Sequence, residues 1–336
     1  MKKSRQLIAM AASLALLFSL TACGGGAANP TNPTEPAGSQ PSEEKTYTVG
    51  ISQLIQHDAL DAATQGFRDA LTEKLGDKVV FNEQNAQGDP ATCATIANSF
   101  VSANVDLIMA NATPALQAAA AATADIPILG TSVTEYSVAL DIKDFNGTVG
   151  GNVSGTSDLA PLDQQAAMIK EFFPDAKNVG LLYCSGEPNS LYQVETVKNF
   201  LEEMGYTATF YSFSDSNDLA AVTTTAVASS DVIYLPTDNT VASNTGIIDS
   251  ISRPAGVPII AGEKGICAGA GVAALSIDYY DLGYATGEMA YRVLTGQEDI
   301  SAMPIEYAPN FTKMYNAEIA ADLNITPPEG YTAITE

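Results

Sequence analysis

The chain has 336 residues, with 15 Lys and Arg against 39 Asp and Glu, which gives a formal net charge of −24 at pH 7. Such a negative surface repels phosphate backbones and anionic lipid, so nucleic-acid binding is excluded. The single histidine, His57, rules out multi-histidine metal sites, and no GxSxG elbow or GxxxxGKS/T loop occurs. We therefore expect neither an enzyme nor a bound cofactor or metal ion.

Residues 1–22 have the pattern of a signal peptide. Three basic residues precede an apolar run over 7–20, which is shorter than the ~20 residues that a helix needs to cross a bilayer. The following Leu-Thr-Ala-Cys23 matches the bacterial lipobox, which predicts cleavage just before Cys23 and a diacylglycerol group on its sulfur. The alternative is an unmodified Cys23 near a conventional cleavage site.

Residues 23–46 are rich in Gly, Pro, Asn, Thr and Ser and predict a flexible tether behind the lipidated Cys23. Loss of residues 1–22 removes three of the 15 basic residues, which leaves 12 against 39 acidic residues and a formal charge of −27. We expect the folded part to be extracytoplasmic and held at the bacterial cell membrane only by its lipid. The odd number of remaining cysteines (Cys93, Cys184 and Cys267) predicts buried or inert thiols.

From residue 46 onward, apolar strands alternate with helices. Strands are predicted over 46–52, 78–84, 105–111 and 126–132, and helices over 59–75, from Pro90 and from Pro114. The alternation restarts after residue 158, with strands over 178–184, 207–213, 231–237, 257–263 and 272–278, and helices between them. Near-continuous apolar strands of this kind favour parallel sheets covered on both faces.

The repeated alternation predicts an α/β fold of two Rossmann-like lobes joined by a hinge. The chain is longer than one hydrophobic core usually spans, so two lobes are expected. We assign residues 47–156 and about 280–302 to the N-terminal lobe, and residues 157–279 and about 303–336 to the C-terminal lobe.

Polar residues follow the strands of both lobes. Ligands of open parallel sheets bind beyond the carboxyl ends of the strands, so these residues are candidates for holding a small polar molecule. They are Ser52, Gln53, His57, Asn85, Gln87, Asn111, Thr113 and Thr134 in the first lobe, and Glu187, Asn189, Ser190, Thr237, Asp238, Asn239, Glu263 and Asp278 in the second. The alternative for each is a cap on the following helix, and for His57 an exposed loop residue or a neighbour of a helix N-terminus.

Several motifs together carry a family resemblance. GISQLIQHDALDAATQGF, NAQGD, ANATPALQA, GNVSGTSD, YCSGEPNS, PTDNTVAS, AGEKG and IDYYDLGYATGEMA resemble the ABC-transporter substrate-binding family associated with tryptophan/tyrosine-type uptake. The resemblance extends from Tyr47 to about Ile325. It implies a type I periplasmic-binding-protein fold that closes on an amino acid, aromatic in type, and hands it to an ABC permease with its ATPase. We expect a monomer. A nucleoside, a sugar, another small metabolite, or a sensory role in a membrane receptor are the alternatives.

An amino-acid ligand would need partners for its charged groups and for its ring. For the ammonium group we rank Asp238 first, Glu263 second, and Asp158, at the end of GNVSGTSD, third. The helices that begin at Pro188-Asn189-Ser190 and at Thr113-Pro114 are candidates for the carboxylate. The candidates for an aromatic wall, with core packing as the alternative, are Tyr136, Tyr183, Tyr192, Tyr279 and Tyr280.

Overall fold

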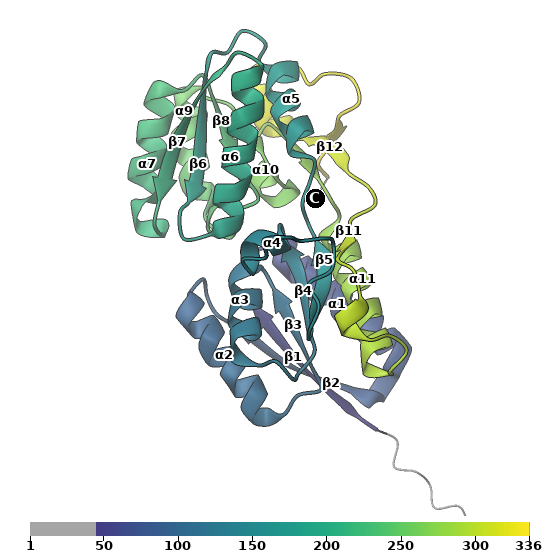
Figure 1. The fold of residues 1–336 in the computed structure, drawn as a ribbon. Coiled ribbons are helices and arrows are strands. Elements are labelled where there is room, and N and C mark those ends of the chain that lie inside the picture. Colours follow the sequence, from purple (N-terminus) through teal and green to yellow (C-terminus); the bar gives the residue numbers. More distant parts are fainter. Residues whose placement is uncertain (1–44, 336) are drawn as a thin grey trace, which may run out of the picture. The chain divides into compact units, whose positions relative to one another are not determined.

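Two sheets carry the fold, and nearly all of their strands are parallel. The computed structural model describes residues 45–335, so the predicted signal peptide, Cys23 and the tether as far as residue 44 lie outside the described residues. In the first sheet the strand order is β11-β5-β4-β3-β1-β2 (Figure 1). Its strands are β1 (Tyr47–Gln53), β2 (Val79–Asn85), β3 (Leu107–Asn111), β4 (Ile128–Val133), β5 (Val153–Ser157) and β11 (Glu306–Tyr307).

Helices cover both faces of the first sheet because its strand residues point alternately to opposite sides. Ile108 packs in one core with α2 and α3, whereas its neighbours Leu107 and Met109 pack in another with α1 and α11. The helices of this lobe are α1 (Asp58–Leu75), η1 (Gly76–Lys78), α2 (Pro90–Ala103), α3 (Thr113–Ala122), α4 (Tyr136–Ala139), α11 (Tyr279–Leu294) and η2 (Ile300–Ala302).

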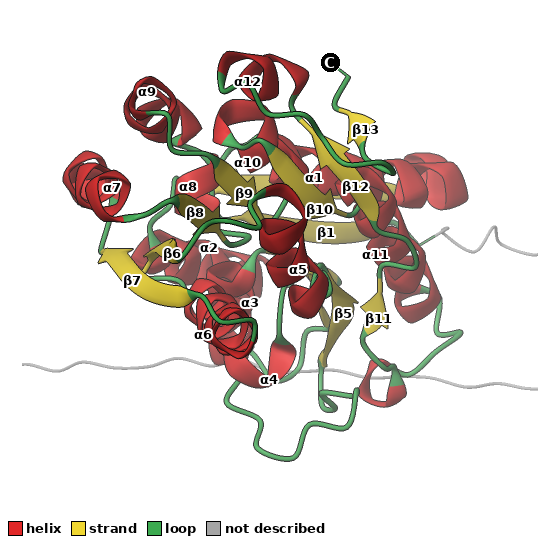
Figure 2. Ribbon diagram, turned by 90° about the horizontal axis from the view of Figure 1, so that it is seen from above, coloured by secondary structure: helices red, strands yellow, loops and turns green. Residues whose placement is uncertain are grey.

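The second sheet has the strand order β13-β12-β10-β9-β8-β6-β7, and only the β10–β12 pair is antiparallel. Leu181 packs towards α5 and α6, and Leu182 towards α7, α9 and α10 on the opposite face (Figure 2). Its strands are β6 (Asn178–Cys184), β7 (Thr207–Phe213), β8 (Val232–Leu235), β9 (Ile259–Ala261), β10 (Ala273–Ser276), β12 (Thr312–Tyr315) and β13 (Thr332–Ala333). Its helices are α5 (Leu162–Phe172), α6 (Pro188–Glu203), α7 (Ser216–Ser229), α8 (Asn239–Ala242), α9 (Thr245–Ala255), α10 (Lys264–Ala270) and α12 (Ala317–Asp322).

The chain passes between the two sheets after β5, after β10 and after β11. The predicted α/β fold of two lobes is therefore confirmed. The assignment of the segment from about 303 to the C-terminal lobe is wrong at its start, because Glu306 and Tyr307 pair with β5 of the first sheet. Met303 and Ile305 also pack in the first lobe's cores. A strand of two residues has no periodicity that a sequence pattern could reveal.

Within residues 45–335, no helix combines the length and the apolar character needed to cross a membrane.

Helices α1 and α11 pack with their backbones in direct contact. A Cβ atom added at Gly283 would fall on the carbonyl oxygen of Ala63, and one added at Gly66 would fall on the carbonyl oxygen of Tyr280. At Gly287 the added atom would lie 2.7 Å from the carbonyl oxygen of Phe67. Glycine is required at these positions by the close approach of the two helices.

We expect Gly283→Ala to destabilise the protein by at least the ~1–3 kcal/mol typical of overpacking, because the obstructing atoms belong to backbone that has no rotamer to change. Urea unfolding followed by circular dichroism measures the loss. Gly246→Ala is the matched control, since Gly246 also lies in a helix and a Cβ there meets no atom within 4 Å. The control should gain up to ~1 kcal/mol from helix propensity. Equal stability of the two variants would contradict the tight α1–α11 contact.

Candidate functional site

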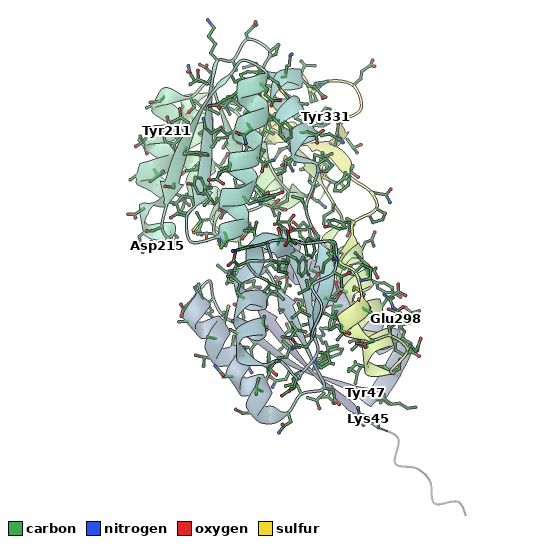
Figure 3. The ribbon with its side chains drawn as sticks, in the orientation of Figure 1. Lys45, Tyr47, Tyr211, Asp215, Glu298 and Tyr331 are labelled. Atoms are coloured by element: carbon green, nitrogen blue, oxygen red, sulfur yellow. The ribbon has the colours of Figure 1, made fainter. Side chains whose placement is uncertain are left out.

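The carboxyl ends of both sheets border one small cavity between the lobes. It is lined by His57, Ala59, Leu60, Ser132, Thr134, Asp158, Asn189, Thr237, Asp238, Asn239, Ala242, Glu263 and Tyr279. All except Ala59, Leu60, Ser132, Ala242 and Tyr279 are among the polar residues that the sequence predicts for the ligand site, and Tyr279 is a candidate for its aromatic wall. Figure 3 shows the side chains of the two lobes meeting at this level. They leave room for little more than a water molecule, so a larger ligand enters only if the lobes move apart.

Four predicted residues of the first lobe lie below the cavity, under α1. Gln53 accepts a hydrogen bond from the hydroxyl of Thr64 at 2.7 Å and donates one to Asp61 at 2.6 Å. Asn111 donates to the carbonyl oxygen of Leu60 at 2.8 Å. Ser52 and Thr113 are buried and do not line the cavity either. Gln53 and Asn111 therefore fix the position of α1 on the sheet.

Asn85, Gln87 and Asp278 are exposed and also lie outside the cavity. Asn85 accepts a hydrogen bond from the backbone N–H of Gln87 at 2.8 Å, and Gln87 has a left-handed φ of 55°. This geometry is that of a turn. Asp278 accepts from the N–H groups of Tyr280 and Asp281, so it caps α11. Asp278 is therefore a helix cap, which is the alternative to a ligand contact that the sequence also allows.

Glu187 and Ser190 are buried behind the cavity wall. Each oxygen of Glu187 accepts two hydrogen bonds from the start of α8: Asn239 donates to one and Thr240 to the other. The hydroxyl oxygen of Ser190 accepts a hydrogen bond from the amide of Asn189 at 3.4 Å. Both residues hold lining residues in place without lining the cavity themselves.

Asp238 is held on both oxygens by the backbone of its own lobe. One oxygen accepts from the N–H of Cys184 at 2.7 Å and the other from the N–H of Val241 at 2.9 Å, which caps α8. Burial, together with the nearby charge of Glu187, raises the pKa of Asp238 to about 8. Both oxygens of Asp238 are therefore engaged mainly in positioning the backbone of the cavity wall.

Asp158 keeps one oxygen free. Its Oδ2 accepts a hydrogen bond from the Tyr279 hydroxyl at 2.9 Å, while its buried Oδ1 has no hydrogen-bond partner. Burial raises the pKa of Asp158, because a charged carboxylate loses its hydration there. The sequence ranks Asp158 third among the candidate partners of an ammonium group, but the hydrogen bonds favour it over Asp238.

Glu263 caps α10 and faces the other lobe. It accepts from the N–H groups of Gly265 and Ile266, and burial raises its pKa while the nearby His57 opposes that shift. His57 Nε2 lies 3.2 Å from Asn239 Oδ1. The predicted cavity-facing role of His57 therefore fits the geometry better than an exposed loop position.

Five buried side-chain oxygen atoms of the described residues have no hydrogen-bond partner. Ser52 Oγ and Asn111 Oδ1 lie outside the cavity, and the other three line it. Those three are Ser132 Oγ, Asp158 Oδ1 and Asn189 Oδ1. An unpaired buried polar atom costs ~1–3 kcal/mol, and native structures contain few of them. The grouping of these three in one cavity, from both lobes, indicates a place where a ligand donates hydrogen bonds.

The sequence does not predict some of the lining residues, and it suggests for the ligand site some tyrosines that lie elsewhere. Ser132 falls within residues 131–134, which the sequence points to at the end of the fourth predicted strand, but its left-handed φ of 53°, which turns the chain at that point, has no sequence signal. Among the candidate aromatic residues Tyr279 alone lines the cavity. Tyr136 and Tyr183 pack in the cores of the two lobes, as the core-packing alternative predicts.

The three cysteines of the described part are free and buried, as predicted. Burial raises the pKa of the Cys93 and Cys184 thiols to about 11 and that of Cys267 further, so the reactive thiolate form is scarce at neutral pH. Within residues 45–335, no group of three or more His, Cys, Asp and Glu side chains is arranged to hold a metal ion.

Known proteins resemble this chain over most of its length. The model of the family described as "ABC transporter substrate binding protein" matches residues 48–334. The tyrosine-binding protein of Clostridioides difficile strain R20291 is 37% identical over 305 residues, which cover 88% of this chain and 86% of that protein. The chain belongs to the ABC transporter substrate-binding protein family. A protein of this family serves a transporter by binding its small-molecule substrate and is not an enzyme.

Two solved structures share the type I periplasmic-binding-protein fold with this member of the family. An ABC domain from Streptococcus pneumoniae in complex with L-Trp has a TM-score of 0.82 at 33% identity and covers 86% of this chain and 100% of its own. The ligand-free, open structure of a substrate-binding protein with adhesive properties from Clostridium difficile has a TM-score of 0.66 at 37% identity. It covers 86% of this chain and 99% of its own. The TM-score against the open structure is lower although its sequence identity is higher. This difference and the narrow cavity both indicate that the lobes of this chain are closed.

We expect the unfolding free energy to fall as the pH rises from about 5 to about 8. The pKa of Asp238 is raised to about 8 in the folded protein, so the folded state holds a proton there that the unfolded state releases in this range. The raised pKa values of Asp158 and Glu263 act in the same direction. The slope is up to ~1.4 kcal/mol per pH unit for each such carboxyl group. Urea unfolding at several pH values measures it.

In the same series, Asp238→Asn should flatten the profile because its side chain does not titrate, whereas Asp278→Asn, at an exposed helix cap, should leave it unchanged. A wild-type stability that is constant between pH 5 and pH 8 would show that these carboxyl groups ionise freely in the fold.

Proposed function

We propose that this chain captures an aromatic amino acid between its lobes, outside the cytoplasmic membrane, and delivers it to an ABC permease. The observation that carries the proposal is the free Oδ1 of Asp158 in a closed, acid-lined cavity. A buried carboxylate without a partner is costly, and the ammonium group of an amino acid supplies that partner. The tyrosine-binding relative and the L-Trp complex support an aromatic ligand.

The ammonium group has three N–H donors, and the cavity offers three unpaired acceptors. Asp158 supplies a carboxylate oxygen, Asn189 an amide oxygen and Ser132 a hydroxyl oxygen. Asp158 follows β5 and Ser132 lies near the end of β4, both in the first sheet, whereas Asn189 belongs to α6 of the second lobe. A ligand that binds all three therefore joins the lobes and stabilises their closed arrangement.

The carboxylate group of the ligand would meet helix starts that lack a side-chain cap. The caps of α8, α10 and α11 are Asp238, Glu263 and Asp278, whose carboxyl groups already occupy the free N–H groups. Helices α1 and α6 have no side-chain cap, and Ala59, Leu60 and Asn189 of their first turns line the cavity. Their free N–H groups favour an anion. The sequence suggests the starts of α6 and α3 as partners of the carboxylate. We retain α6 and not α3, because the start of α3 lies outside the cavity.

The aromatic ring would pack on the few apolar groups of the lining. These are the Tyr279 ring with Leu60, Ala59 and Ala242. Tyr279 is held by its hydrogen bond to Asp158, so ring and ammonium would be recognised by neighbouring groups. Offset or edge-on packing between two aromatic rings contributes ~0.5–1.5 kcal/mol beyond the buried area.

The proposal is tested by a ligand screen on the purified domain. Tryptophan, tyrosine and phenylalanine should raise the melting temperature more than leucine, alanine, glutamate, nucleosides and sugars, since a ligand at 100 times its Kd adds ~2.7 kcal/mol of stability. The chain contains no tryptophan, so the fluorescence of bound L-tryptophan can be followed directly. Tryptophan amide should bind at least about tenfold more weakly, a difference of ~1.4 kcal/mol. Stabilisation by nucleosides or sugars and by no amino acid would refute the aromatic assignment.

Asp158→Asn sharpens the same test. Loss of the buried charged partner should cost more than ~2 kcal/mol of binding free energy in titration calorimetry, with the fold intact by circular dichroism. Asp278→Asn is the control, because it makes the same chemical change at an exposed cap that asparagine also fills well. If Asp238→Asn abolished binding while Asp158→Asn did not, the order predicted from the sequence would stand.

The proposal includes a lipid anchor. A diacylglycerol group on Cys23, after removal of residues 1–22, would hold a monomer at the membrane, and the Gly- and Pro-rich residues after it would let the domain move above the surface. The order of signal pattern, Leu-Thr-Ala-Cys23 and polar segment supports this arrangement.

For the anchor, we expect Cys23→Ser to release the protein from the membrane fraction of expressing cells. Ligand affinity of the released protein should be unchanged, because the residues that line the cavity all lie within 45–335. Fractionation followed by immunoblotting measures the release. A variant that stays firmly in the membrane fraction would indicate an uncleaved signal helix instead.

A further inference from the structure

His57 and Asn239 form a direct contact between the lobes at the edge of the cavity. His57 lies immediately before α1 of the first lobe, and Asn239 begins α8 of the second. The Nε2 atom of His57 is 3.2 Å from Asn239 Oδ1, although 182 positions separate the two residues in the sequence. The contact breaks whenever the lobes separate, because each lobe contributes one partner.

Glu187 determines which way the Asn239 amide points. The Nδ2 group of Asn239 donates to Glu187 Oε2 at 2.7 Å, and its backbone N–H donates to the same oxygen at 3.0 Å. An ionised carboxylate only accepts hydrogen bonds, so the NH2 group of the amide must face Glu187 and the amide oxygen must face His57. His57 Nε2 is therefore the donor in the contact between the lobes.

The contact lies between the cavity and the open side of the interlobe region. Asn239 lines the cavity and also a groove between the lobes, whose other walls include Leu54, Pro90 and Asp215. Asp215, labelled in Figure 3, lies at the end of the second lobe that faces the first. His57 lines the cavity and also an exposed depression with Gln56 and Ser243. Both partners thus border the cavity on one side and a more open surface on the other.

We propose that the His57–Asn239 hydrogen bond, with Glu187 behind it, is a latch that slows the opening of the lobes and so sets the dissociation rate of the ligand. The proposal rests on the proposed capture of a ligand in this cavity. A bond that forms only on closure contributes to the closed state and not to the encounter of ligand with open lobes. Its loss should therefore increase the dissociation rate and leave the association rate unchanged.

The first experiment measures L-tryptophan binding by stopped-flow fluorescence. His57→Ala should raise the dissociation rate about 5- to 10-fold, the effect of losing one hydrogen bond of ordinary strength, with an association rate within about twofold of wild type. His57→Gln retains an N–H donor and should recover much of the loss. The control, Gln56→Ala, changes the exposed neighbour and should behave as wild type.

A double-mutant cycle separates a latch from a direct ligand contact. Asn239→Ala and the His57→Ala/Asn239→Ala double variant should both dissociate about as fast as His57→Ala, because each removes the same bond. If the increases in dissociation rate of the two single variants multiply in the double variant, the latch is overturned. It is also overturned if the ligand dissociates from His57→Gln as fast as from His57→Ala.

A second measurement needs no ligand. Spin labels on exposed sites of the two lobes report their separation by double electron-electron resonance in the ligand-free protein. His57→Ala should populate longer distances than wild type, His57→Gln and Gln56→Ala. Identical distance distributions would overturn the latch. If L-tryptophan, tyrosine and phenylalanine all fail to bind the wild type, the proposed ligand is wrong, and the distances still decide whether the latch exists.

Discussion

The backbone contact between α1 and α11 is the constraint on which the candidate site depends. Gly66, Gly283 and Gly287 let the two helices approach until backbone meets backbone, and both helices begin at the cavity. The start of α1 presents Ala59 and Leu60 there, and the start of α11 presents Tyr279. Because neither helix can slide without a clash, the positions of these groups relative to each other are fixed by the packing of backbone on backbone in the turns beside the cavity.

Carboxyl groups of the second lobe serve structure as much as recognition. Asp238 and Glu263 each cap a helix, and Glu187 holds the start of α8. Their hydrogen bonds orient the wall of the cavity before any ligand arrives, which reduces the ordering cost of binding. Asp158 differs because it belongs to the crossing between lobes and has a free oxygen. The division of roles explains how several buried acids share one cavity.

Much of the architecture is readable from the sequence because strand and helix periodicities are strong. The alternation of apolar strands with helices predicts both lobes, and reading the residue after each strand finds most of the polar lining. What the sequence does not reveal is the direction of each side chain. Gln53 and Asn111 end their strands and Thr134 follows β4, yet only Thr134 reaches the cavity, whereas the other two bind α1.

The remaining errors also have local physical causes. The sequence ranks Asp238 first because a carboxyl group that follows a strand can face the ligand. In the structure its two oxygens accept hydrogen bonds from the N–H groups of Cys184 and Val241. Only the fold determines that these segments lie next to Asp238. Ser132 required an unusual backbone angle, and β11 consists of two residues. Periodicity carries no information about either feature.

The place of α11 in the sequence has a consequence for when the first lobe can fold. Its core on the α1 side is completed by Met289 and Ala290, which follow β1 by more than two hundred positions. Until those residues emerge from the ribosome, Phe67 and Met109 lack the part of their core that α11 contributes. Contacts of such long range also slow folding once the whole chain is available. The first lobe therefore cannot complete this core until most of the chain has been synthesised.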